Sequence, residues 1–181
     1  LAEFTPRVTL LQHRLQEDWE MGLPEAPQAI VSMSAIHHLE PGEKSALYSR
    51  CFQSLAPGGL LLNGDEVRPA DETEYRAELT TWADHMRREM SGGSIPPAFH
   101  DALHGWIDRN VTRFGQPKKS GDDCHETIEA QLEYFRIAGF TTADCQDGGT
   151  AARPGLDRRV RRRHASGSPR VAHAGTAPAT R

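Results

Sequence analysis

Histidines and a carboxylate follow two short apolar runs, and these residue types suit proton transfer. His37 and His38 come shortly after the apolar run 29–33, and Asp65 comes shortly after the run 60–62. Imidazole titrates near neutral pH, and a carboxylate at the tip of a strand is able to act as a base. We therefore take His37, His38 and Asp65 as candidate bases, against the alternative that they are ordinary polar loop residues.

A second set of residues raises the possibility of a metal-dependent hydrolase. His100, His104 and Asp108 lie four residues apart, and the segment HDALH resembles the H-E-x-x-H zinc pattern with Asp in place of Glu. Against a metal site, Asp is one methylene shorter than Glu, and no further ligand lies nearby in the sequence. We expect no metal here and interpret the two histidines as surface residues of a helix.

The candidate bases at 37, 38 and 65 must be positioned by a βαβ unit. The run 29–33 reads as a strand buried on both faces, and Pro41 is suited to the first turn of a helix. Apolar residues then recur every three or four positions, at 47, 48, 51, 52 and 55. Gly58 and Gly59 end this helix before the strand at 60–62, so the two strands are expected to be parallel.

Two segments of the chain carry a family resemblance. Residues 30–67, IVSMSAIHHLEPGEKSALYSRCFQSLAPGGLLLNGDEV, and residues 132–145, LEYFRIAGFTTADC, resemble the second half of a class I S-adenosylmethionine-dependent methyltransferase. The resemblance implies S-adenosylmethionine as cofactor and an unidentified, small-molecule or other, methyl acceptor. Methyl transfer of this kind is promoted largely by positioning and needs no fixed catalytic residue.

The resemblance also implies where the cofactor binds. Ligands of open α/β sheets bind beyond the carboxyl ends of the strands. The expected cofactor-binding residues are accordingly Ser32, Met33, Ser34 and His37, together with the backbone N–H of Leu15. The family usually has an acidic residue where this sequence has His13 and Arg14, so the sequence departs from the family's pattern at this place.

The expected fold is α/β: a partial doubly wound, Rossmann-like sheet with a helical insertion and a disordered basic tail. The methyltransferase part spans residues 1–146. It begins with a strand at 7–12 and ends with a helix at 126–138 and a strand at 141–145. The insertion, residues 66–125, contains helices at about 70–90 and 96–114 and is expected to cover the substrate.

The tail, residues 147–181, has a different composition from the rest of the chain. It is rich in Arg, Ala, Gly and Pro, has no aromatic residue and from Gly148 onward contains one acid, Asp157, although the whole chain has a formal net charge of −4. We expect disorder here. The alternative function is a non-catalytic α/β module whose tail binds nucleic acid or an acidic partner. A shifted reading frame would also produce this change of composition.

Parts of the resembled fold are missing from the sequence. The Gly-rich cofactor loop and the first two strands of the family are absent, and the family's strand order is 3-2-1-4-5-7-6. Only the strands at 29–33 and 60–62 would then be neighbours, and the strand at 141–145 would lack its partner. An unpaired strand leaves backbone polar groups without hydrogen bonds, so we expect this chain alone to be a poorly folded or inactive fragment.

The remaining features favour a cytoplasmic protein. The sequence contains no run of 18 apolar residues, so it predicts no membrane helix, and the N-terminus lacks a signal-peptide pattern. Cys51, Cys124 and Cys145 are widely spaced and form no C-x-x-C pair, which argues against disulfides or structural zinc.

Overall fold

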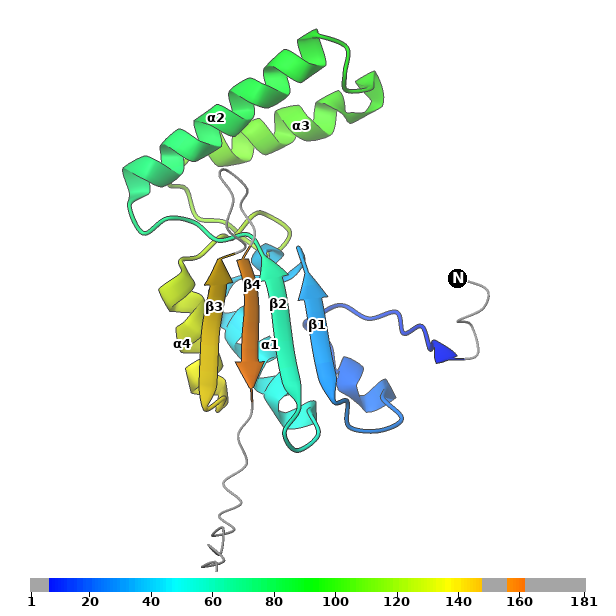
Figure 1. The fold of residues 1–181 in the computed structure, drawn as a ribbon. Helices are drawn as coiled ribbons and strands as arrows, with labels where there is room; N and C mark the ends of the chain where they lie inside the picture. The colour runs from blue at the N-terminus through cyan, green and yellow to red at the C-terminus, as the bar shows by residue number, and fades with distance from the viewer. Residues whose placement is uncertain (1–6, 148–155, 162–181) are drawn as a thin grey trace, which may run out of the picture.

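A four-stranded mixed sheet forms the centre of the molecule. The structure, a computed structural model, describes residues 7–147 and 156–161. The strands are β1 (Ala29–Met33), β2 (Leu60–Asp65), β3 (Thr142–Asp147) and β4 (Leu156–Arg161). Their order is β1-β2-β4-β3, with β1 parallel to β2 and β4 antiparallel to both of its neighbours (Figure 1). This corresponds to the 4-5-7-6 part of the methyltransferase strand order.

The predicted βαβ unit is confirmed. Helix α1 (Pro41–Ser54) starts with Pro41, and its first turn is fixed because Glu43 Oε2 accepts a 2.9 Å hydrogen bond from the backbone N–H of Glu40. Gly58 follows the helix with a φ of 76°, a conformation that glycine adopts without strain. The chain then returns as β2, in register with β1 from Ala29 opposite Leu60.

The hydrophobic core lies between one face of the sheet and two helices. Helix α4 (Ile128–Ala138) packs beside α1 behind the sheet, as predicted for residues 126–138 (Figure 1). The rings of Tyr48 on α1 and Phe135 on α4 are both fully buried, with centroids 4.5 Å apart. The helix begins where Thr127 accepts from the N–H of Ala130.

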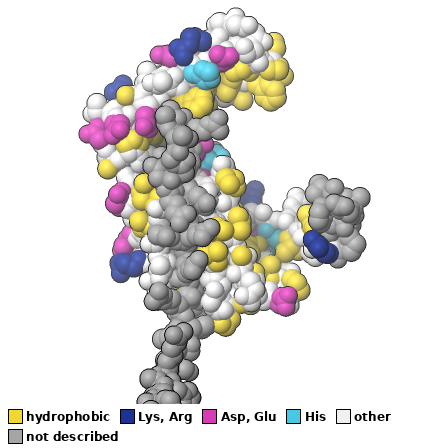
Figure 2. All heavy atoms as spheres, viewed as in Figure 1, with side chains coloured by type: hydrophobic (Ala, Val, Ile, Leu, Met, Phe, Trp, Pro, Cys, Tyr) yellow, Lys and Arg dark blue, Asp and Glu magenta, His cyan; other side chains and the backbone are white. Residues whose placement is uncertain are grey.

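The opposite face of the sheet is open near β1. Figure 2 shows hydrophobic side chains on this face, and Val31 and Met33 of β1 are 67% and 73% exposed. Among the described residues, no helix packs on this side of β1. We expected β1 to be buried on both faces, but only its inward face is covered.

The predicted helical insertion stands beyond the carboxyl ends of β1 and β2 (Figure 1). It consists of α2 (Glu72–Ser91) and α3 (His100–Ile107), and α3 continues into a π-helical turn, Asp108–Thr112. Short 3-10 helices in the described part of the chain are η2 (Trp19–Gly22), η3 (Ile36–His38) and η4 (Pro97–Phe99). No helix within residues 7–147 or 156–161 is long and apolar enough to cross a membrane.

Two expectations about strands were wrong. Residues 7–12 form no strand and are exposed, because the neighbouring strands with which they would pair are not in the sequence. Conversely, residues 156–161 of the expected disordered tail form β4. Without β4, the facing edges of β2 and β3 would leave backbone groups unpaired. β4 lies between these two strands and pairs with both, so β3 does have a partner. The rest of the tail lies outside the described residues.

Candidate active site

His37 and Asp65 form the centre of the candidate site. Because β1 and β2 are parallel neighbours, the segments that follow them meet at the same edge of the sheet. Asp65 Oδ2 accepts a 2.9 Å hydrogen bond from the backbone N–H of His37, and Oδ1 lies 2.5 Å from His37 Nδ1. Both side chains are buried, so the ring of His37 is fixed with its Nε2 atom turned away from Asp65.

The two residues shift each other's titration. Burial by itself lowers the pKa of His37, but the hydrogen bond and the negative charge of Asp65 outweigh it and leave this pKa above its ordinary value. Burial raises the pKa of Asp65, but the hydrogen bond and charge of His37 together lower it by more, so the pKa of Asp65 ends below its ordinary value. The pair therefore stabilises an ionised carboxylate beside the imidazole.

A buried polar chain connects Asp65 to the core. Asn63, which is 1% exposed, donates from Nδ2 to the hydroxyl of Tyr48 at 3.1 Å and reaches Asp65 Oδ2 at 3.5 Å. The Tyr48 hydroxyl in turn donates to Gln131 on α4 at 2.7 Å. These contacts tie the position of the carboxylate to the packing of α1 and α4.

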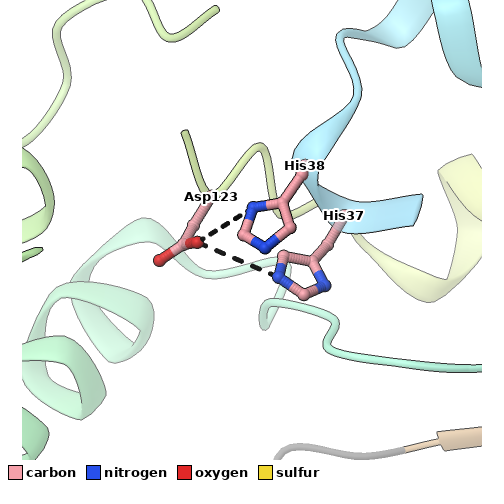
Figure 3. A group of neighbouring side chains, drawn as sticks. All are labelled: His37, His38 and Asp123. Carbon is pink, nitrogen blue, oxygen red and sulfur yellow. Dashed lines mark ion pairs between the residues drawn. The ribbon is translucent and has the colours of Figure 1, made fainter. Parts of the chain in front are cut away.

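Asp123 approaches both histidines from the insertion. Its Oδ1 atom lies 3.4 Å from Nδ1 of His38 and 3.9 Å from Nε2 of His37, and Figure 3 shows both rings turned toward it. Its Oδ2 atom accepts from Trp106 Nε1 at 2.5 Å and from Asn110 at 3.1 Å. The α3 and π-helical segment therefore positions this carboxylate.

His125 adds a third imidazole. Its Nε2 atom lies 3.1 Å from Glu66 Oε2, its Nδ1 atom lies 2.8 Å from the Tyr75 hydroxyl, and its ring centroid is 5.2 Å from that of His37. The close contact with His125 lowers the pKa of Glu66. Three histidines and three carboxylates thus gather at the carboxyl ends of β1 and β2. We refer to His37, His38, Asp65, Glu66, Asp123 and His125 as the histidine cluster.

A cavity of about 450 Å³ adjoins this cluster. Asp123 and His125 belong to both, and Tyr75 and Phe114 give the cavity aromatic walls. Its other lining residues are Pro41, Arg68, Ala70, Glu72, Gly115, Gln116, Lys118, Cys124 and Glu126. The volume falls within the range of small-molecule sites.

The residues predicted to bind the cofactor are only partly brought together. Ser32, Met33 and Ser34 lie at the carboxyl end of β1, where Ser34 takes an unusual positive φ of 47° and donates its N–H to Gly64 O at 2.8 Å. His37 lies in the next turn. Leu15 does not join them, since its carbonyl accepts from Arg50, more than two turns into α1.

These residues fit one side of an S-adenosylmethionine site. Met33 and Ser34 are exposed. Within the described sheet β1 pairs only with β2, so the edge of β1 that faces away from β2 is open at the place expected for the cofactor. The Gly-rich loop that would form the other side is absent from the sequence.

The hydrolase alternative is not supported. His100 Nε2 pairs with the carbonyl of Ile95 at 3.0 Å, and Asp108 pairs with Arg113 at 2.6 Å. Among the described residues, the groups able to hold a metal are His37 with His38 and Asp123, and His37 with Glu66 and His125. Sequence reasoning missed Asp123 and His125. The signal that could have found them is the run DDCHE at 122–126, which is dense in possible ligands.

No family model and no curated protein matches the sequence. The fold is similar to several solved structures. An O-methyltransferase family protein from Burkholderia thailandensis matches with a TM-score of 0.55 and 13% identity, over 90% of this chain and 38% of that one. The S-adenosylmethionine-dependent methyltransferase SibL matches with a TM-score of 0.52 and 14% identity, over 84% and 35% of the two chains.

Human N-acetylserotonin methyltransferase, solved in complex with S-adenosylmethionine, matches with a TM-score of 0.50 and 16% identity, over 85% of this chain and 33% of that one. The chain thus spans about a third of the length of these proteins. At such identities the similarity concerns the fold, and it agrees with the resemblance of the βαβ and C-terminal segments. The chain therefore has a partial class I S-adenosylmethionine-dependent methyltransferase fold.

Proposed function

We propose that this protein takes part in methyl transfer from S-adenosylmethionine to a small-molecule acceptor. The observation that carries the proposal is the histidine cluster beside a cavity, at the carboxyl ends of the parallel strands of a methyltransferase fold. When bound, the cofactor supplies a methyl group on a positively charged sulfur. The chain's own residues then have to hold the acceptor in line and assist the loss of its proton.

On this proposal, Ser32, Met33 and Ser34 contact the cofactor, and the acceptor binds in the cavity lined by Tyr75 and His125. The aromatic walls suit an apolar acceptor body, and the cluster suits a polar group at its reactive end. Because the chain has no Gly-rich loop, we expect it to bind cofactor weakly and to show little or no turnover by itself. The alternative of a nucleic-acid-binding tail has no support in the described residues.

Calorimetric titration with S-adenosylhomocysteine tests the cofactor site. Met33→Arg places a bulky cation on an exposed residue of the proposed site, so we expect at least a tenfold loss of affinity. Val31→Arg makes the same change on the same face, two residues earlier in β1, and should alter the affinity less than twofold. A chain with a cooperative circular-dichroism melt and no measurable binding would contradict the proposal, as would equal effects of the two variants.

A further inference from the structure

Three residues of the histidine cluster form a set of ligands of the kind that transition metals prefer. Ligand atoms of His37, Glu66 and His125 all lie within 4.8 Å of one another. Two imidazoles and one carboxylate suit divalent first-row ions such as Zn²⁺ and Co²⁺. The 3.1 Å separation of His125 Nε2 and Glu66 Oε2 is close to the spacing of about 3.3 Å between two ligands of a tetrahedral ion with bonds near 2.0 Å.

The hydrogen-bond contacts of the second ring nitrogen in His37 and in His125 also favour a metal site. Metal-binding histidines usually use one ring nitrogen for the metal and the other for a hydrogen bond that fixes the ring. His37 Nδ1 is held by Asp65 at 2.5 Å, and His125 Nδ1 is held by the Tyr75 hydroxyl at 2.8 Å. In both residues it is therefore Nε2 that remains for a metal ion.

The surroundings are negatively charged and offer a further ligand. Asp123 Oδ1 lies 3.9 Å from His37 Nε2, and Asp123 belongs to the second group of possible ligands around the same histidine. Three carboxylates, of Asp65, Glu66 and Asp123, meet within the cluster. A divalent cation would offset their charge.

We propose that His37, Glu66 and His125, assisted by Asp123, bind a divalent transition-metal ion. The ion would lie beside the cavity, since Asp123 and His125 line it. Given the proposed function, this assigns the acceptor to the class of molecules with a hydroxyl group that coordinates a metal. In that transfer the acceptor's O–H bond breaks and its proton passes to solvent. The oxygen bonds to the methyl carbon, and the carbon–sulfur bond breaks with its electron pair remaining on sulfur.

The test is titration of the tag-free chain with Co²⁺, followed by visible absorption, and with Zn²⁺, followed by calorimetry. We expect one ion per chain at micromolar affinity or tighter, and at least a hundredfold loss of affinity in Glu66→Gln and in His125→Gln. His85→Gln and Glu89→Gln change an exposed helical pair with a 3.9 Å separation and should leave the affinity unchanged. Circular dichroism at the titration temperature identifies the variants that are folded.

A folded wild-type chain that binds neither ion would overturn the metal site. Undiminished binding in both Glu66→Gln and His125→Gln would also overturn it, as would an equal loss in His85→Gln. Should one of the cluster variants not fold, the other decides. Titration of the same wild-type sample with S-adenosylhomocysteine separates the two proposals. A chain that binds the metal but not S-adenosylhomocysteine would contradict only the proposed function. A chain that binds S-adenosylhomocysteine but neither metal would contradict only the metal site.

Discussion

Asp65 contacts His37 through both of its carboxylate oxygens. Oδ2 accepts from the backbone N–H of His37 at 2.9 Å, and Oδ1 lies 2.5 Å from Nδ1 of the His37 ring. One carboxylate at the end of β2 thereby fixes both the turn η3 and the orientation of the imidazole that this turn presents. Twenty-eight residues separate the pair in sequence, and only the parallel register of β1 and β2 brings them together. The same contact serves the fold and the proposed site, which makes Asp65 the most informative residue to change.

Asp65→Asn should lower the free energy of unfolding by about 1–3 kcal/mol, because an amide cannot replace both charge-assisted hydrogen bonds of the carboxylate. It should also change the tautomer of His37, which nitrogen-15 NMR of the imidazole ring reports. Asp84→Asn removes a carboxylate from an exposed ion pair with Arg87 and should change neither quantity. An unaltered His37 tautomer in Asp65→Asn would contradict the orienting role.

The parts of the fold that the sequence predicted depend on local signals. By backbone geometry alone, Pro41 marks the first turn of α1 and Gly58 marks the turn between α1 and β2, and the apolar spacing between them identifies the buried face of the helix. Strand pairing is different because it depends on distant segments. Residues 7–12 have strand-like side chains but form no strand, and Leu156–Arg161 have an unpromising composition but two strand edges beside them.

The candidate site was predictable to a similar degree. His37 follows β1 and Asp65 is the last residue of β2 in one βαβ unit, so their meeting could be inferred from topology. Asp123 and His125 reach them from the far end of the insertion, where backbone hydrogen bonds from Cys124 to His37 O (2.8 Å) and from Gly121 to His38 O (2.9 Å) hold the loop in place. No spacing in the sequence reports such contacts.

Lys44 is a second buried residue with a testable role. It is 0% exposed and donates to Glu126 at 2.9 Å and to the carbonyl of Cys124, so it anchors the loop that carries His125. Lys44→Met should lower the free energy of unfolding by about 3–5 kcal/mol, because it leaves Glu126 without its buried partner. Urea denaturation measures this loss, and Lys44→Met with Glu126→Gln should recover part of it.

The matched control for Lys44 is Arg136→Met, which breaks an exposed ion pair with Glu133 and should leave the urea midpoint almost unchanged. A loss in Lys44→Met as small as that in the control would show that the buried pair contributes little. Failure of the double variant to exceed the single variant in stability would show that the loss comes from packing and not from an unpaired charge.

Two glutamates should change the pH dependence of stability in opposite directions. The Ser120 hydroxyl and the Glu40 N–H hold the pKa of Glu43 below its usual value, so its contribution is present above the unfolded pKa of about 4.3 and is lost as the pH falls through the folded pKa. Burial and the charge of Glu74 raise the pKa of Glu78, so its ionisation at neutral pH disfavours the folded state.

Glu43→Gln should therefore lower the urea midpoint at pH 7, and Glu78→Gln should raise it, with both differences shrinking toward pH 3. The two changes are small because Glu43 is only half-buried and Glu78 is exposed to solvent. Equal midpoints at pH 7 for wild type and Glu43→Gln would argue that the Ser120 contact does not hold the loop on α1.

Gly139 is required by backbone geometry at the end of α4. Its φ is 104°, and a Cβ atom there would lie 3.0 Å from the ring of Phe52, which packs against Phe140 in the core. Gly139→Ala should lower the free energy of unfolding by about 1–3 kcal/mol, since both the backbone and the ring must adjust. Gly42→Ala, in the first turn of α1 with no atom within 4 Å of the new Cβ, should be neutral or slightly stabilising. Equal thermal midpoints for the two variants would mean that α4 ends without need of a left-handed residue.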